Sequence, residues 1–260
     1  MSAVLVIAGA DSSGGAGIAQ DLRTLADLDT RALCAVTAVT AQTDAAMLAT
    51  HLIPATMLAG QIAAAFATTA VGAVKVGMLG SAAGVQAVAD ALDGHADVPL
   101  VLDPVLASSS GGELLDGPGR ARLAVALLPR ATLLTPNLPE LAALTGSRPA
   151  RGEAEALRQG WQLLECGAGA VLVKGGHGGG AQSTDLLLQR GSAPVRLEAP
   201  RSPHGMRGSG CALATAIAAA LAAGRSLEAA CRLGKAYLTR QLSGDSPKRD
   251  AIAARDASEG

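Results

Sequence analysis

The sequence predicts an α/β protein built on one doubly wound, mainly parallel sheet, with helices on both faces and an antiparallel hairpin at one edge. Short apolar runs of strand length alternate with longer helix-like segments over most of the 260 residues, as they do when helical crossovers join parallel strands. Later in the chain two strand-like runs follow each other directly, which favours the hairpin. Apolar residues make up 49% of the chain and charged residues 17%, so a sizeable core is expected.

The predicted strands are short runs rich in Val, Leu and Ala, bounded by polar or turn-forming residues. Six runs fit parallel strands: Val4–Ala8, Leu33–Val39, Ala73–Val76, Leu100–Asp103, Thr132–Thr135 and Val171–Lys174. The predicted hairpin pairs Thr184–Gln189 with Val195–Ala199 around Gly191.

Helices are predicted between the strands and at the C-terminal end. The clearest helical segments are Ile18–Leu28, Pro54–Ala67, Ala83–Leu92, Cys211–Ala223 and Leu227–Leu242. No internal repeat or linker divides the chain, so we expect residues 1–242 to form a single domain. The polar residues 243–260 are expected to be a mobile tail.

Composition and charge argue against several classes of partner. The formal net charge is −1 without a basic block, and the chain has one Trp, one Tyr and one Phe, so a nucleic-acid partner is not favoured. The run 211–223 is too short and too weakly apolar to span a bilayer. The cysteines are scattered without a C-x-x-C pair, which argues against a thiolate metal site: Cys34, Cys166, Cys211 and Cys231. We expect a soluble, cytoplasmic protein with a small-molecule substrate and no membrane partner.

Ligands of such sheets bind beyond the carboxyl ends of the strands, so the loops there are the candidate site. The first strand is followed by a loop with four glycines within residues 8–17, but it is neither a phosphate-binding loop of the G-x-x-x-x-G-K-S/T type nor a G-x-G-x-x-G fingerprint. A plain turn and a ligand loop are equally compatible with it. Asp103 and Lys174 also follow strands, where an acidic residue can hold Mg²⁺ or cap a turn and a lysine can neutralise a moving phosphate.

Two helix starts carry further chemistry. Asn137 with Glu140 three residues later is a helix-capping signature, and the same place also suits a phosphate. The segment Gly208-Ser209-Gly210-Cys211 opens an Ala-rich helix, whose first amides and dipole would form an anion hole. A thiol at that position is expected to have a lowered pKa and to act as a base. The alternative is a Gly-rich turn with an ordinary buried cysteine.

Several of these segments together resemble the hydroxymethylpyrimidine/phosphomethylpyrimidine kinases of the ribokinase-like superfamily. The matching segments run in the family's order from about Val4 to about Leu221: AGADSSGGAGIAQDL at 8–22, TAVTAQT at 37–43, KVGML at 75–79, VLDPV at 101–105, TPNLPE at 135–140, KGGH at 174–177 and GSGC at 208–211. The resemblance implies a ribokinase-like fold, ATP and Mg²⁺ as donor, a homodimer, and phosphorylation of 4-amino-5-hydroxymethyl-2-methylpyrimidine and its monophosphate in thiamine biosynthesis.

The resemblance also implies roles for individual residues. The pyrimidine site would be formed by Gly9, Asp21, Gln42, Met78 and Val105. The nucleotide phosphates would be bound by Asp103, Asn137, Glu140 and Lys174, with Asp103 and Glu140 also near the metal. The catalytic group would be Cys211 as base, Lys174, and the anion hole of Gly208, Ser209 and Gly210.

Two departures from the family pattern bear on function. Met206-Arg207 separates His204-Gly205 from Gly208, so the loop looks two residues longer than the family's His-Gly-Thr-Gly-Cys. The longer loop would either shift the anion hole or let Arg207 reach a substrate phosphate. The family's C-terminal Gly-Pro stretch has no counterpart in residues 243–260. Two alternatives stay open: a pyridoxal kinase of the same superfamily, and a non-catalytic pyrimidine sensor on a kinase fold.

Overall fold

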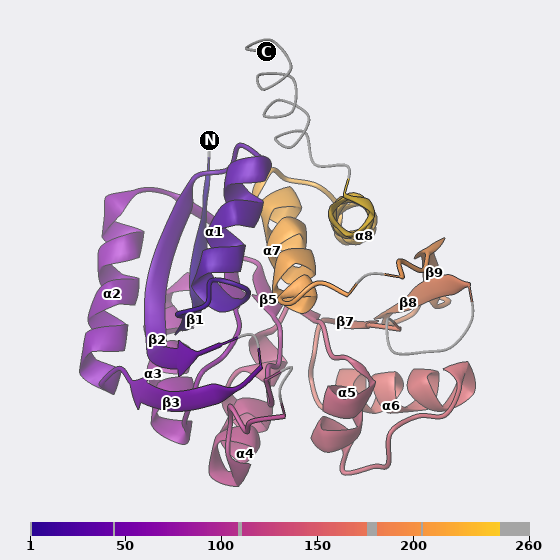
Figure 1. The fold of residues 1–260 in the computed structure, drawn as a ribbon, viewed down its shortest axis with the longest axis horizontal. Helices are drawn as coiled ribbons and strands as arrows, with labels where there is room; N and C mark the ends of the chain where they lie inside the picture. The colour runs from indigo at the N-terminus through magenta and orange to yellow at the C-terminus, as the bar shows by residue number, and fades with distance from the viewer. Residues whose placement is uncertain (1, 44, 109–110, 176–180, 204, 245–260) are drawn as a thin grey trace.

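The computed structural model describes residues 2–43, 45–108, 111–175, 181–203 and 205–244. These residues form one nine-stranded sheet in the order β3-β2-β1-β4-β5-β6-β7-β8-β9 (Figure 1). The strands are β1 (Ala3–Asp11), β2 (Ala32–Gln42), β3 (Met47–Leu52), β4 (Val71–Val76), β5 (Leu100–Leu102), β6 (Leu133–Leu134), β7 (Ala170–Val173), β8 (Gln182–Gln189) and β9 (Val195–Pro200).

The sheet is parallel from β2 to β7 and antiparallel at both edges. The β8–β9 hairpin confirms the prediction for the second half of the chain. Strand β3, which pairs antiparallel with β2, was not predicted, because its sequence MLATHL is mostly exposed and lacks the alternation of a half-buried strand. The chain winds one way from β1 to β3 and the other way from β4 onward, so the switch point lies between β1 and β4.

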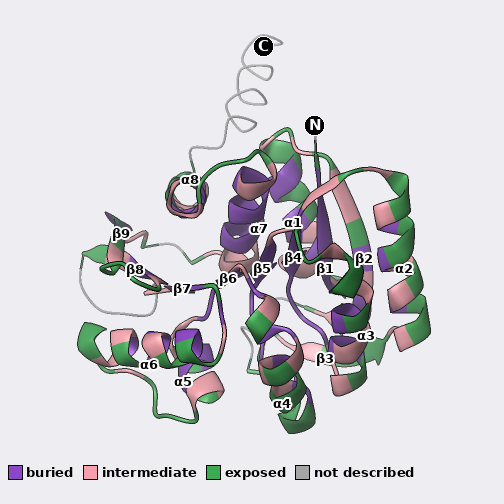
Figure 2. Cartoon of the chain, turned by 180° about the vertical axis from the view of Figure 1, so that it is seen from behind, coloured by how far each residue is buried: buried purple, intermediate pink, exposed green. Residues whose placement is uncertain are grey.

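Helices cover both faces of the sheet (Figures 1 and 2). One face carries α1 (Gly17–Asp27), α7 (Ser209–Ala222) and α8 (Leu227–Ser243); the other carries α2 (Ala55–Thr68), α3 (Ala82–Leu92), α4 (Gly117–Ala126), α5 (Leu138–Thr145) and α6 (Glu153–Glu165). Short 3₁₀ turns follow α3 at Asp93–His95 and α4 at Leu128–Arg130. The layered α/β fold that the sequence predicts is therefore confirmed.

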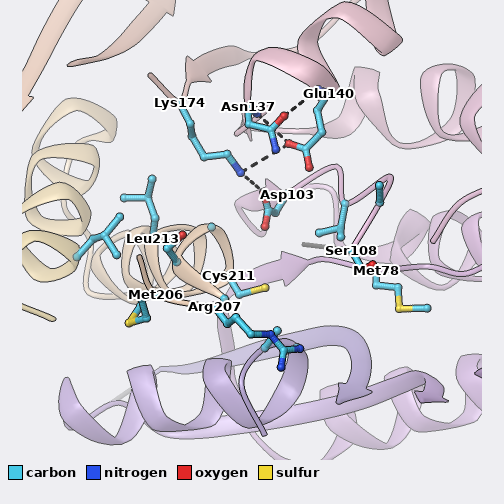
Figure 3. Close-up of a pocket in the computed structure, with 18 of the residues that line it drawn as sticks. Met78, Asp103, Ser108, Asn137, Glu140, Lys174, Met206, Arg207, Cys211 and Leu213 are labelled. Atoms are coloured by element: carbon cyan, nitrogen blue, oxygen red, sulfur yellow. Dashed lines mark hydrogen bonds and ion pairs between the residues drawn. The ribbon is translucent and has the colours of Figure 1, made fainter. Parts of the chain in front are cut away.

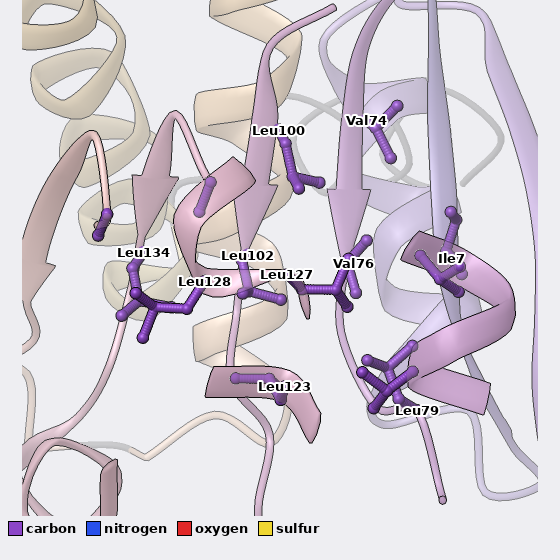
Figure 4. Close-up of a cluster of buried hydrophobic side chains, with 14 of the residues drawn as sticks. Ile7, Val74, Val76, Leu79, Leu100, Leu102, Leu123, Leu127, Leu128 and Leu134 are labelled. Carbon is purple, nitrogen blue, oxygen red and sulfur yellow. The ribbon is translucent and has the colours of Figure 1, made fainter. Parts of the chain in front are cut away.

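The core is split by the sheet into two apolar layers. In β1, Val4 and Val6 face α1 and α7, while Leu5 and Ile7 face α2 and α3, as the two-residue period of a strand requires. Figure 4 shows the second layer, where leucines and valines of the central strands meet those of α4 and the turn that follows it. With almost no aromatic residues, α7 packs through a long run of buried small side chains, which brings its first turn close to the strand ends.

Parts of the chain lie outside the described residues. They include His177 and His204 and all of the expected tail beyond Gly244. Across the described residues, no helix is long and apolar enough to cross a membrane.

Candidate active site

A cavity of about 930 Å³ lies at the carboxyl ends of the central strands. Its walls come from the loops after β1, β4, β5, β6 and β7, and from the first turn of α7. Figure 3 shows these side chains converging from separate elements on one space. This is the position at which ligands of doubly wound sheets bind, so the cavity is the candidate active site.

Most of the predicted site residues line this cavity. They are Gly9, Gln42, Met78, Asp103, Val105, Asn137, Glu140, Lys174, Arg207, Gly208, Ser209, Gly210 and Cys211. Asp21 is the exception, because its carboxylate lies beneath the cavity in the protein interior. The topology thus brings together groups that are far apart in the sequence.

A charged cluster occupies one end of the cavity. Lys174, which follows β7, places Nζ 2.7 Å from Oδ1 of Asp103 and 3.7 Å from Oε2 of Glu140. The hydroxyl of Thr135 donates to the same Asp103 oxygen at 3.0 Å. Burial alone would lower the pKa of Lys174, but these two carboxylates raise it above its usual value, so the ammonium stays charged. A fixed positive charge at this point suits the phosphates of a nucleotide.

Glu140 combines a structural role with a place in the cavity wall. It forms a capping box with Asn137 at the start of α5, in which each side chain accepts a hydrogen bond from the other residue's backbone N–H at 2.8 Å. Burial raises the pKa of the Glu140 carboxyl to about 7, although the nearby Lys174 opposes the shift. Both interpretations of the Asn137–Glu140 spacing, a helix cap and a site residue, are therefore compatible with the geometry.

The first turn of α7 faces the charged cluster. Gly208 caps the helix with φ of +69°, and a Cβ there would lie 2.6 Å from the carbonyl oxygen of Gly15, so the position requires glycine. A Cβ on Gly210 would lie 3.1 Å from Nζ of Lys174. The first amides of a helix have no acceptor within it, and here they lie beside a lysine at the edge of the cavity. Together they form a site suited to an anion.

Cys211 follows in the same turn, and its predicted low pKa is wrong for this protein without ligands. Burial raises the pKa of its thiol to about 11, although the ammonium of Lys75 and a hydrogen bond from the Gly17 backbone N–H favour the thiolate. The helix position alone does not decide the acidity, because burial of the sulfur disfavours its charged form. At neutral pH only a small fraction of Cys211 is therefore thiolate, but that thiolate is a strong base.

The other end of the cavity is less charged. Gly9 and Met78 are in close contact, since a Cβ on Gly9 would lie 2.8 Å from Sδ of Met78. The Thr37 hydroxyl donates to the Met78 carbonyl at 2.7 Å and holds that strand end in place. Gln42 and Val105 complete this end. An apolar wall with one carboxamide fits a small heteroaromatic ring that offers a donor and an acceptor.

Arg207 lies on the opposite side of Cys211 from Lys174 (Figure 3). Its guanidinium binds Oδ2 of Asp11 at 3.0 Å and Oγ of Ser13 at 2.8 Å, and it also reaches the carbonyl of Thr43 at 3.4 Å. These contacts hold the guanidinium at the cavity wall, and its predicted contact with a substrate phosphate stays a prediction. Arg207 joins the loops after β1 and β2 to the segment that leads into α7.

Asp21, which is predicted to bind the pyrimidine, is not among the residues that line the cavity. Its side chain is fully buried, with Oδ2 2.8 Å from Nζ of Lys75 and Oδ1 accepting from the Thr215 hydroxyl at 2.6 Å. Both carboxylate oxygens are thus engaged within the protein, and the predicted contact with the pyrimidine stays a prediction. The burial of this face of α1 depends on α7, which lies far later in the chain.

Three polar residues that sequence reasoning left without a role also line the cavity. Lys75 lies on its floor, and Asp185 pairs with Lys235 at 2.8 Å near the charged cluster. Oδ1 of Asp185 accepts a hydrogen bond from the Gly175 backbone N–H, so it holds the segment directly after Lys174. The signal for Lys75 was a charged residue within an otherwise apolar strand.

The donor set of the cavity fits a magnesium ion that arrives with a nucleotide. Mg²⁺ takes one or two carboxylates and completes its shell with water and phosphate oxygens, and Asp103 and Glu140 are two such carboxylates on one wall. Within the described part of the chain, no group of three or more His, Cys, Asp or Glu side chains could hold a metal by itself.

Comparisons with known proteins agree over most of the chain. The family model described as phosphomethylpyrimidine kinase matches residues 11–253. The hydroxymethylpyrimidine/phosphomethylpyrimidine kinase of Rhizobium meliloti is 42% identical over 240 residues, 92% of this chain and 90% of that protein. Phosphomethylpyrimidine kinase from Clostridium difficile 630 matches in structure with a TM-score of 0.80 at 33% identity, covering 93% of this chain and 100% of that one. Pyridoxal kinase from Staphylococcus aureus, solved with AMP-PCP and pyridoxal, matches in structure with a TM-score of 0.83 at 29% identity. The match covers 92% of this chain and 86% of that one.

Proposed function

Because the chain belongs to the phosphomethylpyrimidine kinase family, we propose that it transfers the terminal phosphoryl group of ATP to 4-amino-5-hydroxymethyl-2-methylpyrimidine and then to the resulting monophosphate, in thiamine biosynthesis. The chain is thus a small-molecule kinase with the ribokinase-like fold.

One observation carries the assignment of roles within the site. Lys174, at the charged end of a single cavity, lies beside the first turn of α7, and the same cavity includes the less charged end with Gly9 and Met78. A nucleotide bound at the charged end would place its terminal phosphate beside Lys174, and a pyrimidine at the other end would place its hydroxymethyl group beside Cys211. This is the arrangement that phosphoryl transfer requires, because its catalysis depends mainly on positioning and charge stabilisation.

In the first phosphorylation, the hydroxymethyl oxygen forms a bond to the terminal phosphorus of ATP. The bond from that phosphorus to the ADP oxygen breaks, and the hydroxyl proton moves to the thiolate sulfur of Cys211. The amides of Gly208, Ser209, Gly210 and Cys211 bind the phosphoryl oxygens, and Lys174 offsets their charge. In the second phosphorylation the acceptor is a phosphate oxygen, which carries no proton at neutral pH and therefore needs no base.

Asp103 and Glu140 would hold the Mg²⁺ that accompanies the nucleotide. When bound, that ion supplies charge neutralisation for the phosphate oxygens. Asn137 would keep Glu140 in place through the capping box.

Release of ADP by the purified chain tests the proposal. The three acceptors to compare are the hydroxymethylpyrimidine, its monophosphate and pyridoxal, each with Mg²⁺ and ATP. We expect turnover with both pyrimidines. Tight binding of the pyrimidine without release of ADP would instead support a non-catalytic sensor.

A pyridoxal kinase is the second candidate, because the Staphylococcus aureus protein of that name shares the fold. Both substrates are heteroaromatic rings with a hydroxymethyl group. Gln42 and Met78 at the ring end of the cavity favour the aminopyrimidine, since a carboxamide complements its paired donor and acceptor. A higher kcat/KM for pyridoxal than for the hydroxymethylpyrimidine would reverse this preference.

We also propose that residues 1–242 act as one domain and that two copies of the chain form a dimer. A single sheet takes strands from Ala3 to Pro200, which supports one domain.

The dimer is supported by strand β3, which lies at the edge of the sheet. Leu48 of this strand is 71% exposed, and Leu52 and Val39 beside it are exposed as well. Exposed apolar edge strands tend to be covered by a partner, and light scattering of the purified chain would measure the mass.

A further inference from the structure

A buried ion pair lies directly beneath the cavity, and the reaction described above does not use it. Lys75 of β4 and Asp21 of α1 are 0% exposed, and Nζ of Lys75 lies 2.8 Å from Oδ2 of Asp21. The free energy lost when two charges this deeply buried give up their hydration usually exceeds the gain from their attraction. A contribution to stability therefore does not account for the presence of the pair. Its position relative to the reacting groups is therefore informative.

The Lys75–Asp21 pair is connected to α7, the helix that carries Cys211. Oδ1 of Asp21 accepts a hydrogen bond of 2.6 Å from the hydroxyl of Thr215. Thr215 lies four residues after Cys211 in α7, which places the two side chains on the same face of the helix. Asp21 therefore holds both the ammonium of Lys75 and the helix face that carries the thiol.

The local backbone leaves room for this ammonium at the cavity floor. Lys75 is among the residues that line the cavity. Gly77, two residues later, has no side chain, and a Cβ there would lie 2.9 Å from Nζ of Lys75. Any other residue at Gly77 would push the ammonium from its place.

Four charged groups act on the Cys211 thiol, each from a different element. The electrostatic influence of Lys75 comes from β4, that of Asp21 from α1, that of Asp103 from the end of β5 and that of Lys174 from the end of β7. Burial raises the pKa of the thiol, Lys75 is the strongest opposing influence, and Asp21 and Asp103 add to the rise. Burial would lower the pKa of Lys75 as well, but Asp21 raises it above the usual lysine value, so its charge persists.

We propose that Lys75 is a positioning residue for the thiolate of Cys211: its ammonium, fixed by Asp21 and through it by Thr215, stabilises the negative sulfur that accepts the substrate proton. Asp21 then acts on the thiol indirectly, because it fixes the ammonium of Lys75 and the hydroxyl of Thr215. In this proposal, the Asp21 of the segment 8–22 supports the pyrimidine site without contacting the ring. This inference rests on the proposed role of Cys211 as the base for the first phosphorylation.

Alkylation of Cys211 tests the inference without any need for turnover. The exposed Cys34 and Cys166 are first replaced by Ala, since neither contributes to the site. In that background, Asp21→Asn with Lys75→Met removes both charges and keeps the side-chain volumes. We expect iodoacetamide to alkylate Cys211 about tenfold more slowly at about pH 8, because one unit of thiol pKa changes the thiolate fraction tenfold.

Lys235→Met provides the matched control, because it removes another buried lysine that pairs with an aspartate at 2.8 Å but is not one of the charges acting on the thiol. Its Cys211 alkylation rate should stay within twofold of the parent rate. In the double variant, kcat for the hydroxymethylpyrimidine should fall about tenfold with KM unchanged. An unchanged alkylation rate in a double variant with a native circular dichroism spectrum would show that the pair is only structural.

A second measurement keeps the pair intact, in case the double variant does not fold. The NMR signal of the Lys75 ε-carbon is followed from about pH 8 to about pH 10.5 in the parent protein and in Cys211→Ala. We expect a shift in the parent, as the thiol begins to ionise, that is absent from Cys211→Ala. Identical titrations in both proteins would overturn the inference. If the Lys75 signal shifts as the thiol ionises but the chain releases no ADP, the proposed kinase function is contradicted while the role of Lys75 stands.

Discussion

Lys174 and Asp103 lie 2.7 Å apart at the charged end of the cavity, joined as an ion pair across the ends of β5 and β7. The carboxylate fixes the ammonium, and the ammonium faces the first turn of α7, where a Cβ on Gly210 would be only 3.1 Å from Nζ. The pair therefore sets where positive charge is available to a migrating phosphoryl group.

Replacement of Lys174 by Met should reduce kcat for both phosphorylations by about a hundredfold, which corresponds to nearly 3 kcal/mol of lost charge stabilisation. The side-chain volume is retained, so KM for the pyrimidine should change little. ADP release at saturating ATP measures the effect. A loss confined to KM for the pyrimidine would contradict the role of Lys174 at the transferred group.

The two phosphorylations should differ in their need for Cys211. Cys211→Ala should lower kcat for the hydroxymethylpyrimidine by about a hundredfold, within the range of general base catalysis. It should lower kcat for the monophosphate much less, because that acceptor oxygen carries no proton. Cys231→Ala, at a buried cysteine outside the cavity, is the matched control. Equal losses for both acceptors would mean that the sulfur acts by position and not as a base.

The raised pKa of the Cys211 thiol, about 11 without ligands, predicts a pH dependence for the first step. The thiolate fraction rises about tenfold per unit below that value, and kcat/KM reports ionisations of the free enzyme. We therefore expect kcat/KM for the hydroxymethylpyrimidine to increase steadily between about pH 7 and about pH 9. A flat profile over this range would exclude the thiolate of the free enzyme as the base.

Glu140 should make stability depend on pH. Its folded pKa is raised from the usual 4.5 to about 7, so its contribution to stability is fully present below about 4.5 and is lost as pH rises through about 7. Glu140→Gln keeps an oxygen for the capping box but does not titrate. Relative to the parent, the variant should gain on the order of 2 kcal/mol between about pH 5 and about pH 8. Urea unfolding with EDTA measures this, and a constant difference would contradict the shift.

Arg207 should affect acceptor binding through the loops that it joins. Arg207→Gln removes the ion pair with Asp11, so the loops after β1 and β2 lose their link to α7. We expect KM for both pyrimidines to rise about tenfold while kcat changes less than twofold. Arg196→Gln, at a half-exposed arginine on β9, is the control. A rise confined to the monophosphate would instead support the predicted contact between Arg207 and a substrate phosphate.

Residues that directly follow strands could be placed from the sequence. Asp103, Lys174 and the Asn137–Glu140 pair all follow strands, where the carboxyl ends of parallel strands place a site, and the family resemblance assigned them to the nucleotide. The structure brings them together in one cavity. The same reasoning applied to the start of α7, where glycines and an Ala-rich helix are visible in the sequence.

Properties that depend on depth of burial could not be predicted in this way. The thiol of Cys211 was expected to be acidic from its helix position, but its burial and the nearby carboxylates of Asp21 and Asp103 raise its pKa. Asp21 was assigned to the ring site, yet α7 covers it and binds it through Thr215. Strand β3 escaped prediction because an exposed edge strand needs no apolar pattern. For Cys211 and Asp21 the deciding contacts come from distant parts of the chain.

The products formed by the purified chain test the central claim most directly. Phosphorus NMR of a mixture with ATP, Mg²⁺ and the hydroxymethylpyrimidine should show ADP, then a pyrimidine monophosphate, then the pyrimidine diphosphate. ATP that stays intact in the presence of a folded protein and bound pyrimidine would contradict the account.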